Sequence, residues 1–300
     1  MADKARTVLI GSSLDEGSED LLRTGVAWAR ATGAKVHVAH AFSPPLGYAN
    51  ELGPFPQADA FLVEEENRLR DALAEQAERA GVAPDELSGV TLQRGAPHRV
   101  LCGLAEELDA DLLLISATVG GRLHRMLGST ADRIIRRASC PVLVLRGELP
   151  VPPRRVLAPV DVSSLSGDAF RIGLERLREL RGGEATEIEA LFVLSVIQRQ
   201  VAPQFTPEQV DRFAAEELER FVERHAGGAA PRVQRKVRTG NTREQILEEI
   251  GEARPDLVLV GTHGLGGFDR VVIGSVAADV IRESPCSVLV MPAAAMQDQS

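Results

Sequence analysis

The chain repeats itself at an interval close to half its length. Residues 140–144 read CPVLV, and residues 286–290 read CSVLV, 146 positions later. A repeat of this period in a chain of 300 residues predicts two copies of one domain rather than a single larger core. We place the copies at residues 1–147 and 154–300, joined by the stiff, proline-rich stretch 149–153.

Within the second copy, short apolar runs alternate with stretches in which apolar residues recur at helical spacing. The segment Thr206-Pro207-Glu208-Gln209 is typical of a helix start, with an N-cap threonine, a proline in the first helical position and a glutamine that completes a capping box. The buried stripe of that helix is expected to contain Val210, Phe213, Leu218, Phe221 and Val222. We expect strands at 155–160, 188–196, 233–239, 257–260 and 287–291, with helices at 170–177, 207–222, 242–253 and 276–282.

Strands separated by helices indicate parallel pairing through right-handed crossovers, because parallel neighbours need a long connection. The predicted fold class is therefore α/β, with two tandem doubly wound domains of the Rossmann-like kind, each a five-stranded parallel sheet flanked by helices. In such sheets a ligand lies beyond the carboxyl ends of the strands, where the strand order reverses. The loops after the first and fourth strands are the places to look for a site.

A glycine-rich segment follows the fourth strand of the second copy. It reads GTHGLGG over residues 261–267 and leads to Gly274-Ser275-Val276-Ala277. A polyphosphate needs backbone N–H groups at close range, which glycine permits, and Ser275 stands where it would cap the next helix. A glycine-rich turn also occurs for purely structural reasons, but this position in the sheet favours an anion site. The segment has neither the Gly-Lys-Ser/Thr of a Walker loop nor a Rossmann fingerprint after the first strand.

Gly261-x-x-Gly264, nine residues and Gly274-Ser275 resemble the nucleotide-binding signature of the ATP-binding universal stress proteins. Residues 156–163 are similar to the first strand and turn of that family, and the resemblance extends over nearly the whole chain as two domains. It implies an adenine nucleotide hydrolase-like fold, ATP with Mg²⁺ on its phosphates, and a pseudo-twofold pair of domains whose fifth strands, 141–145 and 287–291, lie together. It also implies a binding site formed by Pro159, Val160, Asp161, Val193, Gly261, Thr262, His263, Gly264, Gly274, Ser275, Val276 and Ala277, with Asp161 and Val193 at the adenosine.

The first copy departs from this signature. Ser116 and Val119 stand where the two leading glycines would be, and Ser13 stands where the family has aspartate. We expect this copy to bind nucleotide weakly or not at all, because side chains would crowd the close approach of a phosphate. Its retained Gly128-Ser129 is explained equally well as a helix start.

Charge and composition exclude several classes of partner. A net charge of −9 and a sequence pI near 5.3 argue against nucleic-acid binding, and no apolar run approaches the length of a membrane span. We therefore expect a cytoplasmic protein without membrane or nucleic-acid partners. The three cysteines are too few and too scattered for a disulfide framework or a CxxC metal site.

No catalytic constellation can be identified from the sequence. Ser163, Ser164 and Ser166 lack a Gly-x-Ser-x-Gly elbow, and neither a triad nor a set of metal ligands has recognisable spacing. Three interpretations stay open: an ATP-binding module for stress response and signalling, a slow ATP hydrolase or nucleotidyl- or phosphoryl-transfer enzyme, and a ligand-free dimerisation or regulatory module. The sequence also leaves open a protein partner and a homodimer of whole chains.

Overall fold

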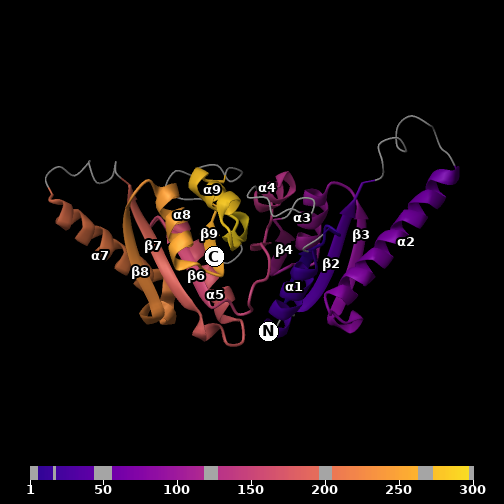
Figure 1. Cartoon of the computed structure of the whole chain (residues 1–300), viewed down its shortest axis with the longest axis horizontal. Helices are drawn as coiled ribbons and strands as arrows, with labels where there is room; N and C mark the ends of the chain where they lie inside the picture. The colour runs from indigo at the N-terminus through magenta and orange to yellow at the C-terminus, as the bar shows by residue number, and fades with distance from the viewer. Residues whose placement is uncertain are drawn as a thin grey trace.

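The chain builds one continuous ten-stranded sheet covered by helices (Figure 1). The computed structural model describes residues 6–15, 18–43, 56–117, 128–195, 205–262 and 273–296. In Figure 1 the two halves of the chain lie side by side, with α2 and α7 at the two outer ends. Within the described ranges, no helix combines the length and the apolar character needed to cross a membrane.

The elements of the two halves follow one another in the same order. The first half contains β1 (Thr7–Gly11), α1 (Ser18–Thr32), β2 (Lys35–Phe42), α2 (Pro56–Arg79), η2 (Pro84–Glu86), β3 (Leu87–Arg94), α3 (Pro97–Glu107), β4 (Leu112–Ser116), α4 (Ser129–Ile135) and β5 (Val142–Leu145). The second half contains β6 (Arg155–Val160), α5 (Ser164–Arg178), η3 (Gly183–Ala185), β7 (Glu187–Ser195), α7 (Pro207–Ala226), η4 (Gly227–Arg232), β8 (Val233–Gly240), α8 (Thr242–Ala253), β9 (Leu257–Gly261), α9 (Ser275–Glu283), β10 (Ser287–Met291) and η5 (Ala294–Met296).

Each half contributes five parallel strands to the sheet, in the orders β3-β2-β1-β4-β5 and β8-β7-β6-β9-β10. The halves meet where β5 pairs with β10 in antiparallel fashion, with Leu143 opposite Leu289. The predicted α/β fold class is confirmed, and so is the predicted pairing of the two fifth strands. Because each strand covers the edge of the other, neither half exposes this edge to solvent.

The helices divide between the two faces of the sheet. Side chains from α1, α2, α5 and α7 pack into one apolar cluster, represented by Leu21, Leu73, Phe170 and Leu218. Side chains from α3, α4, α8 and α9 pack into the other, represented by Leu101, Ile134, Ile250 and Ile281. Both clusters run across the junction of the halves, so the halves share their cores.

The amino ends of the first strands show the repeat at atomic level. The carboxylate of Asp111 accepts a hydrogen bond from the Thr7 N–H at 2.9 Å. In the second half, Asp256 accepts from the N–H groups of Arg154 and Arg155 at 2.7 and 3.0 Å. An aspartate just before the fourth strand thus holds the beginning of the first strand in both halves.

Polar contacts also join the halves outside the sheet. On the side of α1 and α5, Arg6 forms an ion pair with Glu179 at 3.0 Å, and the Arg181 N–H donates to the Ala31 carbonyl at 3.0 Å. On the opposite face, Arg146 of the first half contacts the C-terminal turn of α9. These contacts fix the relative position of the two repeats on both faces.

The capping box predicted at Thr206 is confirmed. The Thr206 hydroxyl accepts from the Gln209 N–H, and the Gln209 side chain accepts from the Thr206 N–H at 2.8 Å. One member of the predicted buried stripe is wrong: Phe213 is 38% exposed and packs edge-on against Phe205. The other four members are buried.

Candidate functional site

The strand order of the second half reverses at β6, which lies between β7 and β9. This is the switch point at which doubly wound sheets bind ligands. Here β6 and β9 remain in register for only two residue pairs, the last of which is Leu157–Val258. The equivalent strands of the first half pair over four residues, as far as Gly11–Ile115. Toward the carboxyl ends of β6 and β9, the second half therefore lacks the last ladder hydrogen bonds that join β1 and β4 in the first half.

Pro159 explains why this ladder stops. Successive residues of a strand direct their N–H and C=O groups to opposite neighbours, and the Arg155 carbonyl accepts from Asp256, on the β9 side. Leu157 and Pro159 face the same side, but proline has no N–H to donate. The first half has Gly11 at the equivalent position, so its ladder continues.

The turn after β6 is organised around Asp161. One carboxylate oxygen of Asp161 accepts from the Ser163 N–H at 3.1 Å and from the Ser163 hydroxyl at 2.6 Å, and the Asp161 N–H donates to the Ser166 hydroxyl at 3.3 Å. Val162 between them has a φ of 57°. A β-branched residue in this region is strained, and such strain persists where the surroundings over-determine the turn, often at functional sites. The turn therefore holds the Asp161 carboxylate in a fixed place directly after the carboxyl end of β6.

The equivalent turn of the first half has the same backbone but different chemistry. Leu14 has a φ of 59°, so the left-handed residue is repeated. Ser13 stands in place of the aspartate and donates to Asp15. The Ser12 hydroxyl turns inward and donates to Gln76 of α2 at 2.7 Å, where both side chains are buried. Both turns thus engage their polar groups within the protein, and the chemical difference is that Ser13 of the first half stands where the second half has the carboxylate of Asp161.

The glycine-rich segment is pinned where its two described ends meet. The Thr262 N–H donates to Met291 at 3.1 Å, and the Thr262 carbonyl accepts from the Gly274 N–H at 2.8 Å. Thr262 is 2% exposed, and its hydroxyl also approaches the Met291 carbonyl, at 3.4 Å. Thr262 and Gly274 therefore close the base of the loop, and the Gly274 N–H is engaged by the protein itself. His263 and Gly264, which the sequence assigned to the site, lie outside the described residues.

Helix α9 begins directly after this closure. Gly274 is its N-cap, so the prediction that Ser275 caps the helix is wrong; Ser275 is the first helical residue. No side chain of the described segments caps this end, and the first hydrogen bond along the helix runs from Ala278 to Gly274. The first-turn N–H groups of Ser275, Val276 and Ala277 therefore point out of the helix at its positive end, where an anion is favoured.

Val193 lies on the other side of β6, in β7. The ladder between β6 and β7 ends at the pair Val160–Phe192, and β7 continues to Ser195. On its far side, Val193 is opposite Arg238 of β8. The main chain of β7 thus extends past the end of β6 beside Asp161, where the sequence placed the adenosine. From the sequence, Pro159 was placed in the site and Ser166 was considered only as a nucleophile; neither the interruption of the ladder at Pro159 nor the hydrogen bond between the Asp161 N–H and Ser166 was predicted. A proline inside an apolar strand was the available signal for the interruption.

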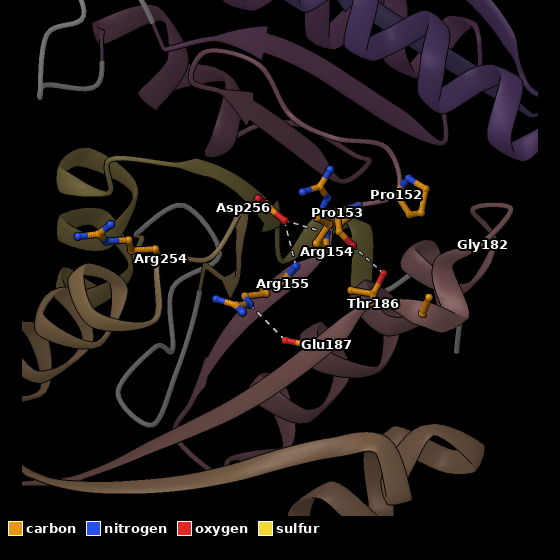
Figure 2. Close-up of a pocket in the computed structure, with 10 residues that line it drawn as sticks. Pro152, Pro153, Arg154, Arg155, Gly182, Thr186, Glu187, Arg254 and Asp256 are labelled. Atoms are coloured by element: carbon orange, nitrogen blue, oxygen red, sulfur yellow. Dashed lines mark hydrogen bonds and ion pairs between the residues drawn. The ribbon is translucent and has the colours of Figure 1, made fainter.

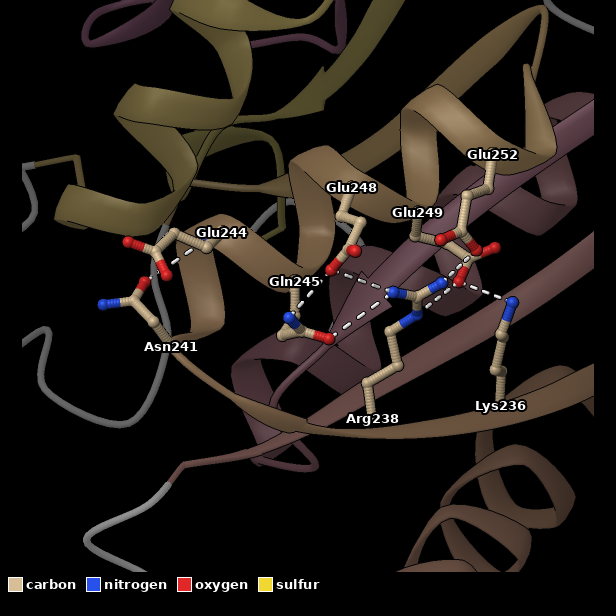
Figure 3. A network of polar contacts seen from close by, with 8 residues as sticks. All are labelled: Lys236, Arg238, Asn241, Glu244, Gln245, Glu248, Glu249 and Glu252. Atoms are coloured by element: carbon tan, nitrogen blue, oxygen red, sulfur yellow. Dashed lines mark hydrogen bonds and ion pairs between the residues drawn. The ribbon is translucent and has the colours of Figure 1, made fainter.

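A network of charged side chains supports this part of the sheet from the α8 face (Figure 3). Glu249 is 1% exposed and accepts from Arg238 and from Lys236, each at 2.6 Å. Arg238 also contacts Glu248 at 3.3 Å, as well as Glu252. Burial, and then the charge of Glu249, raises the pKa of the nearby Glu189. The network neutralises buried charges between β8 and α8, and its carboxylates are committed to cations of the protein.

A pocket of about 420 Å³ lies at the opposite, amino end of the second sheet half (Figure 2). Its polar groups are largely used within the protein. Asp256 accepts the two main-chain bonds described above, Thr186 donates to the Pro153 carbonyl at 2.8 Å, and Arg155 pairs with Glu187 at 3.2 Å. The pocket is lined by Pro152, Pro153, Arg154, Arg155, Gly182, Ala185, Thr186, Glu187, Arg254 and Asp256. It is separate from the carboxyl ends of β6 and β9, and the first turn of α9 does not line it.

Other reactive groups in the described segments are placed for packing. The thiols of Cys102 and Cys140 are buried, and burial raises their pKa to about 11 and about 12. Thiols with such pKa values are protonated at neutral pH and are poor nucleophiles. Across the described ranges, no group of three or more His, Cys, Asp or Glu side chains is arranged to hold a metal ion.

Comparison with known proteins agrees with the tandem architecture. Residues 4–146 and 153–292 both match the model of the universal stress protein family. A universal stress protein of Mycobacterium tuberculosis is 26% identical over 245 residues, 79% of this chain and 80% of the relative. One of Mycolicibacterium smegmatis is 25% identical over 299 residues, 95% of this chain and 96% of the relative.

Solved structures share the fold of the whole chain. A functionally unknown protein from Pseudomonas aeruginosa superposes with a TM-score of 0.67 at 16% identity, covering 98% of this chain and 95% of that one. A universal stress protein from Archaeoglobus fulgidus superposes with a TM-score of 0.64 at 18% identity, covering 96% and 98%. At these identities the likeness shows the fold alone. With both halves matched by one family model, the chain belongs to the universal stress protein family.

Proposed function

We propose that the second half of the chain binds ATP beyond the carboxyl ends of β6 and β9, and that the protein serves as a nucleotide-dependent module in stress signalling. The observation that carries this proposal is the ladder that stops at Leu157–Val258 beside the uncapped first turn of α9. The second half combines an interrupted ladder at the switch point, a carboxylate in the turn that follows, and first-turn N–H groups of α9 that no side chain of the described segments caps. The other half, at 1–147 in the division that we propose, lacks the interrupted ladder and the aspartate.

The phosphates are assigned to the side of the proposed site where α9 begins. The N–H groups of Ser275, Val276 and Ala277 supply donors, and the positive end of the helix favours the negative charge. Gly261 and Gly264 allow the main chain of the loop to approach the phosphates without side-chain interference. Mg²⁺ would accompany the phosphate charge, and we assign no protein ligands to it.

The adenosine is assigned to the β6 and β7 side. A carboxylate accepts several hydrogen bonds, so Asp161 can bind a ribose hydroxyl while it keeps its two bonds to Ser163. Pro159 and Val160, at the end of β6, are assigned to the same side of the site. The main chain of β7 around Val193 is assigned to the adenine edge.

Isothermal titration with ATP in the presence of Mg²⁺ tests the proposal. The wild-type protein should bind about one ATP per chain, and Gly261→Val combined with Gly264→Val should abolish the heat of binding, because Cβ atoms obstruct the approach of the phosphates. Ser116→Val in the first half, at the position equivalent to Gly261, is the matched control and should leave the titration unchanged. Absence of ATP binding by the wild-type protein, or full binding by the double variant, would contradict the proposal.

A further inference from the structure

Arg146 connects the first half of the chain to the helix that begins at the proposed phosphate site. It follows β5 directly, and its N–H donates to the hydroxyl of Ser287, the first residue of β10, at 3.0 Å. Its guanidinium Nη2 donates to the Ile281 carbonyl at 2.6 Å and to the Arg282 carbonyl at 3.2 Å. Both carbonyls belong to the last turn of α9, so a cation of one half caps a helix of the other.

Arg146 is partly buried, as is its contact with the Ile281 carbonyl. Burial lowers the pKa of the Arg146 guanidinium, and its Nε is buried without a hydrogen-bond partner among the described groups. No carboxylate of the described segments forms an ion pair with it. The positive charge is instead placed against the negative end of the α9 dipole. Partial burial of a guanidinium group without a carboxylate partner among the described residues costs free energy, so the helix carbonyls fix the position of the Arg146 side chain.

The two ends of α9 are rigidly linked. The helix has nine residues, which corresponds to about 13 Å along its axis. Helix α9 is also held by α8, whose Arg243 forms ion pairs with Glu283 at 2.6 Å and with Asp279 at 3.5 Å. A shift at the carbonyl end of so short a helix therefore moves the N–H groups of Ser275 to Ala277 by a similar amount.

The contact has no counterpart in the other direction. The repeat places Pro292 after β10, at the position that Arg146 occupies after β5. Proline has neither an N–H nor a cationic side chain, so the second half cannot hold the C-terminal turn of α4 in this way. The first half, whose signature is degenerate, supplies the arginine, and α9 of the second half, whose signature is intact, accepts its hydrogen bonds.

We propose that Arg146 is a positioning residue for the phosphate end of the ATP site, acting across the junction of the halves through α9. This inference rests on the proposed function. It gives the first half a part in nucleotide binding without a nucleotide of its own. It also makes the affinity for phosphates depend on how the two halves are docked.

The test compares ATP with adenosine in two arginine variants. Arg146→Met removes the cap on α9 and should weaken ATP binding about tenfold while it changes adenosine binding less than twofold, because only the phosphate donors move. Arg146→Lys keeps the charge and one donor, and should lower the ratio of ATP to adenosine affinity about threefold. Arg6→Met is the matched control, since Arg6 also joins the halves but contacts Glu179 on the other face; it should leave both affinities unchanged.

The outcomes separate the inference from the function on which it rests. An unchanged ATP affinity in Arg146→Met, or an equal loss for ATP and adenosine, would refute the positioning role while leaving ATP binding intact. Should Arg146→Met fail to fold, the ratio of ATP to adenosine affinity in Arg146→Lys decides the question. A ratio equal to that of the wild type refutes the positioning role of Arg146. A wild-type protein that binds no ATP refutes the proposed function and this inference together.

Discussion

Replacing Glu249 by glutamine should destabilise the protein far more than the same change at Glu252, although both carboxylates contact Arg238 (Figure 3). Glu249 is 1% exposed, whereas the Glu252 side chain is 55% exposed. Glutamine preserves the size and one acceptor of the side chain and removes its charge. The two variants therefore compare the same chemical change in a buried and in a solvated position.

The magnitude follows from the contacts of Glu249. Loss of one partner from a buried ion pair typically costs 3–5 kcal/mol, because a charge is left uncompensated. Two features reduce this cost: the Lys236 side chain is 38% exposed and can be hydrated, and Arg238 keeps its contacts with Glu248 and Glu252. We expect Glu249→Gln to lower the free energy of unfolding by about 2 kcal/mol, and Glu252→Gln by about 0.5 kcal/mol or less, as for surface pairs.

Thermal unfolding followed by circular dichroism measures the difference. For a protein of this size, 1 kcal/mol corresponds to a shift of about 2–4 °C, so Glu249→Gln should lower Tm by about 5 °C and Glu252→Gln by about 1 °C. Urea midpoints should rank the two variants in the same order. Equal shifts for both variants, or a higher Tm for Glu249→Gln, would refute the reasoning that buried charge compensation stabilises β8 against α8.

Three further predictions concern other parts of the second half. Thr206→Ala removes the N-cap of α7 and should cost about 1 kcal/mol in thermal unfolding, while Thr206→Ser should be nearly neutral. The pKa of Glu189 is raised in the folded state, so its contribution to stability is present below the ordinary value of 4.5 and is lost as pH rises through the folded pKa. Glu189→Gln should therefore stabilise the protein at pH 7 relative to wild type. A gain in stability that persists unchanged at pH 4 would contradict this prediction. Pro159→Ala restores a main-chain donor toward β9 and should protect that amide from hydrogen exchange while weakening ATP binding; an amide that exchanges freely would show that the ladder stops for another reason.

Local signals were sufficient to predict much of this architecture. The capping box at Thr206 involves residues three apart, so its outcome depends little on the rest of the chain. The antiparallel pairing of β5 with β10 followed from the family resemblance, together with the two equivalent strands that the repeat supplies. Alternation of strand and helix likewise predicted the parallel order within each half. The capping box and the parallel order need only short-range spacing or an internal comparison, whereas the pairing of the fifth strands also needed the family resemblance.

Features that depend on distant neighbours could not be predicted in the same way. Arg146 reaches the end of α9, 135 residues along the chain, and nothing in its own surroundings indicates that target. The effect of Pro159 becomes clear only when β9 is known to lie on the side of its missing N–H. Phe213 has the correct helical spacing for burial, yet it packs against Phe205 at the surface. The resemblance assigned Gly274 to the nucleotide site, but it did not predict that the Gly274 N–H donates to the Thr262 carbonyl and closes the loop.

A crystal structure of the protein grown with ATP and Mg²⁺ tests the central claim most directly. The account predicts a nucleotide in the second half only, with phosphate oxygens about 2.7–3.2 Å from the N–H groups of Ser275, Val276 or Ala277 and with the ribose near Asp161. Density for the nucleotide in the first half, or at the amino-end pocket beside Asp256, would contradict it. So would a structure in which saturating ATP leaves the carboxyl ends of β6 and β9 without a nucleotide.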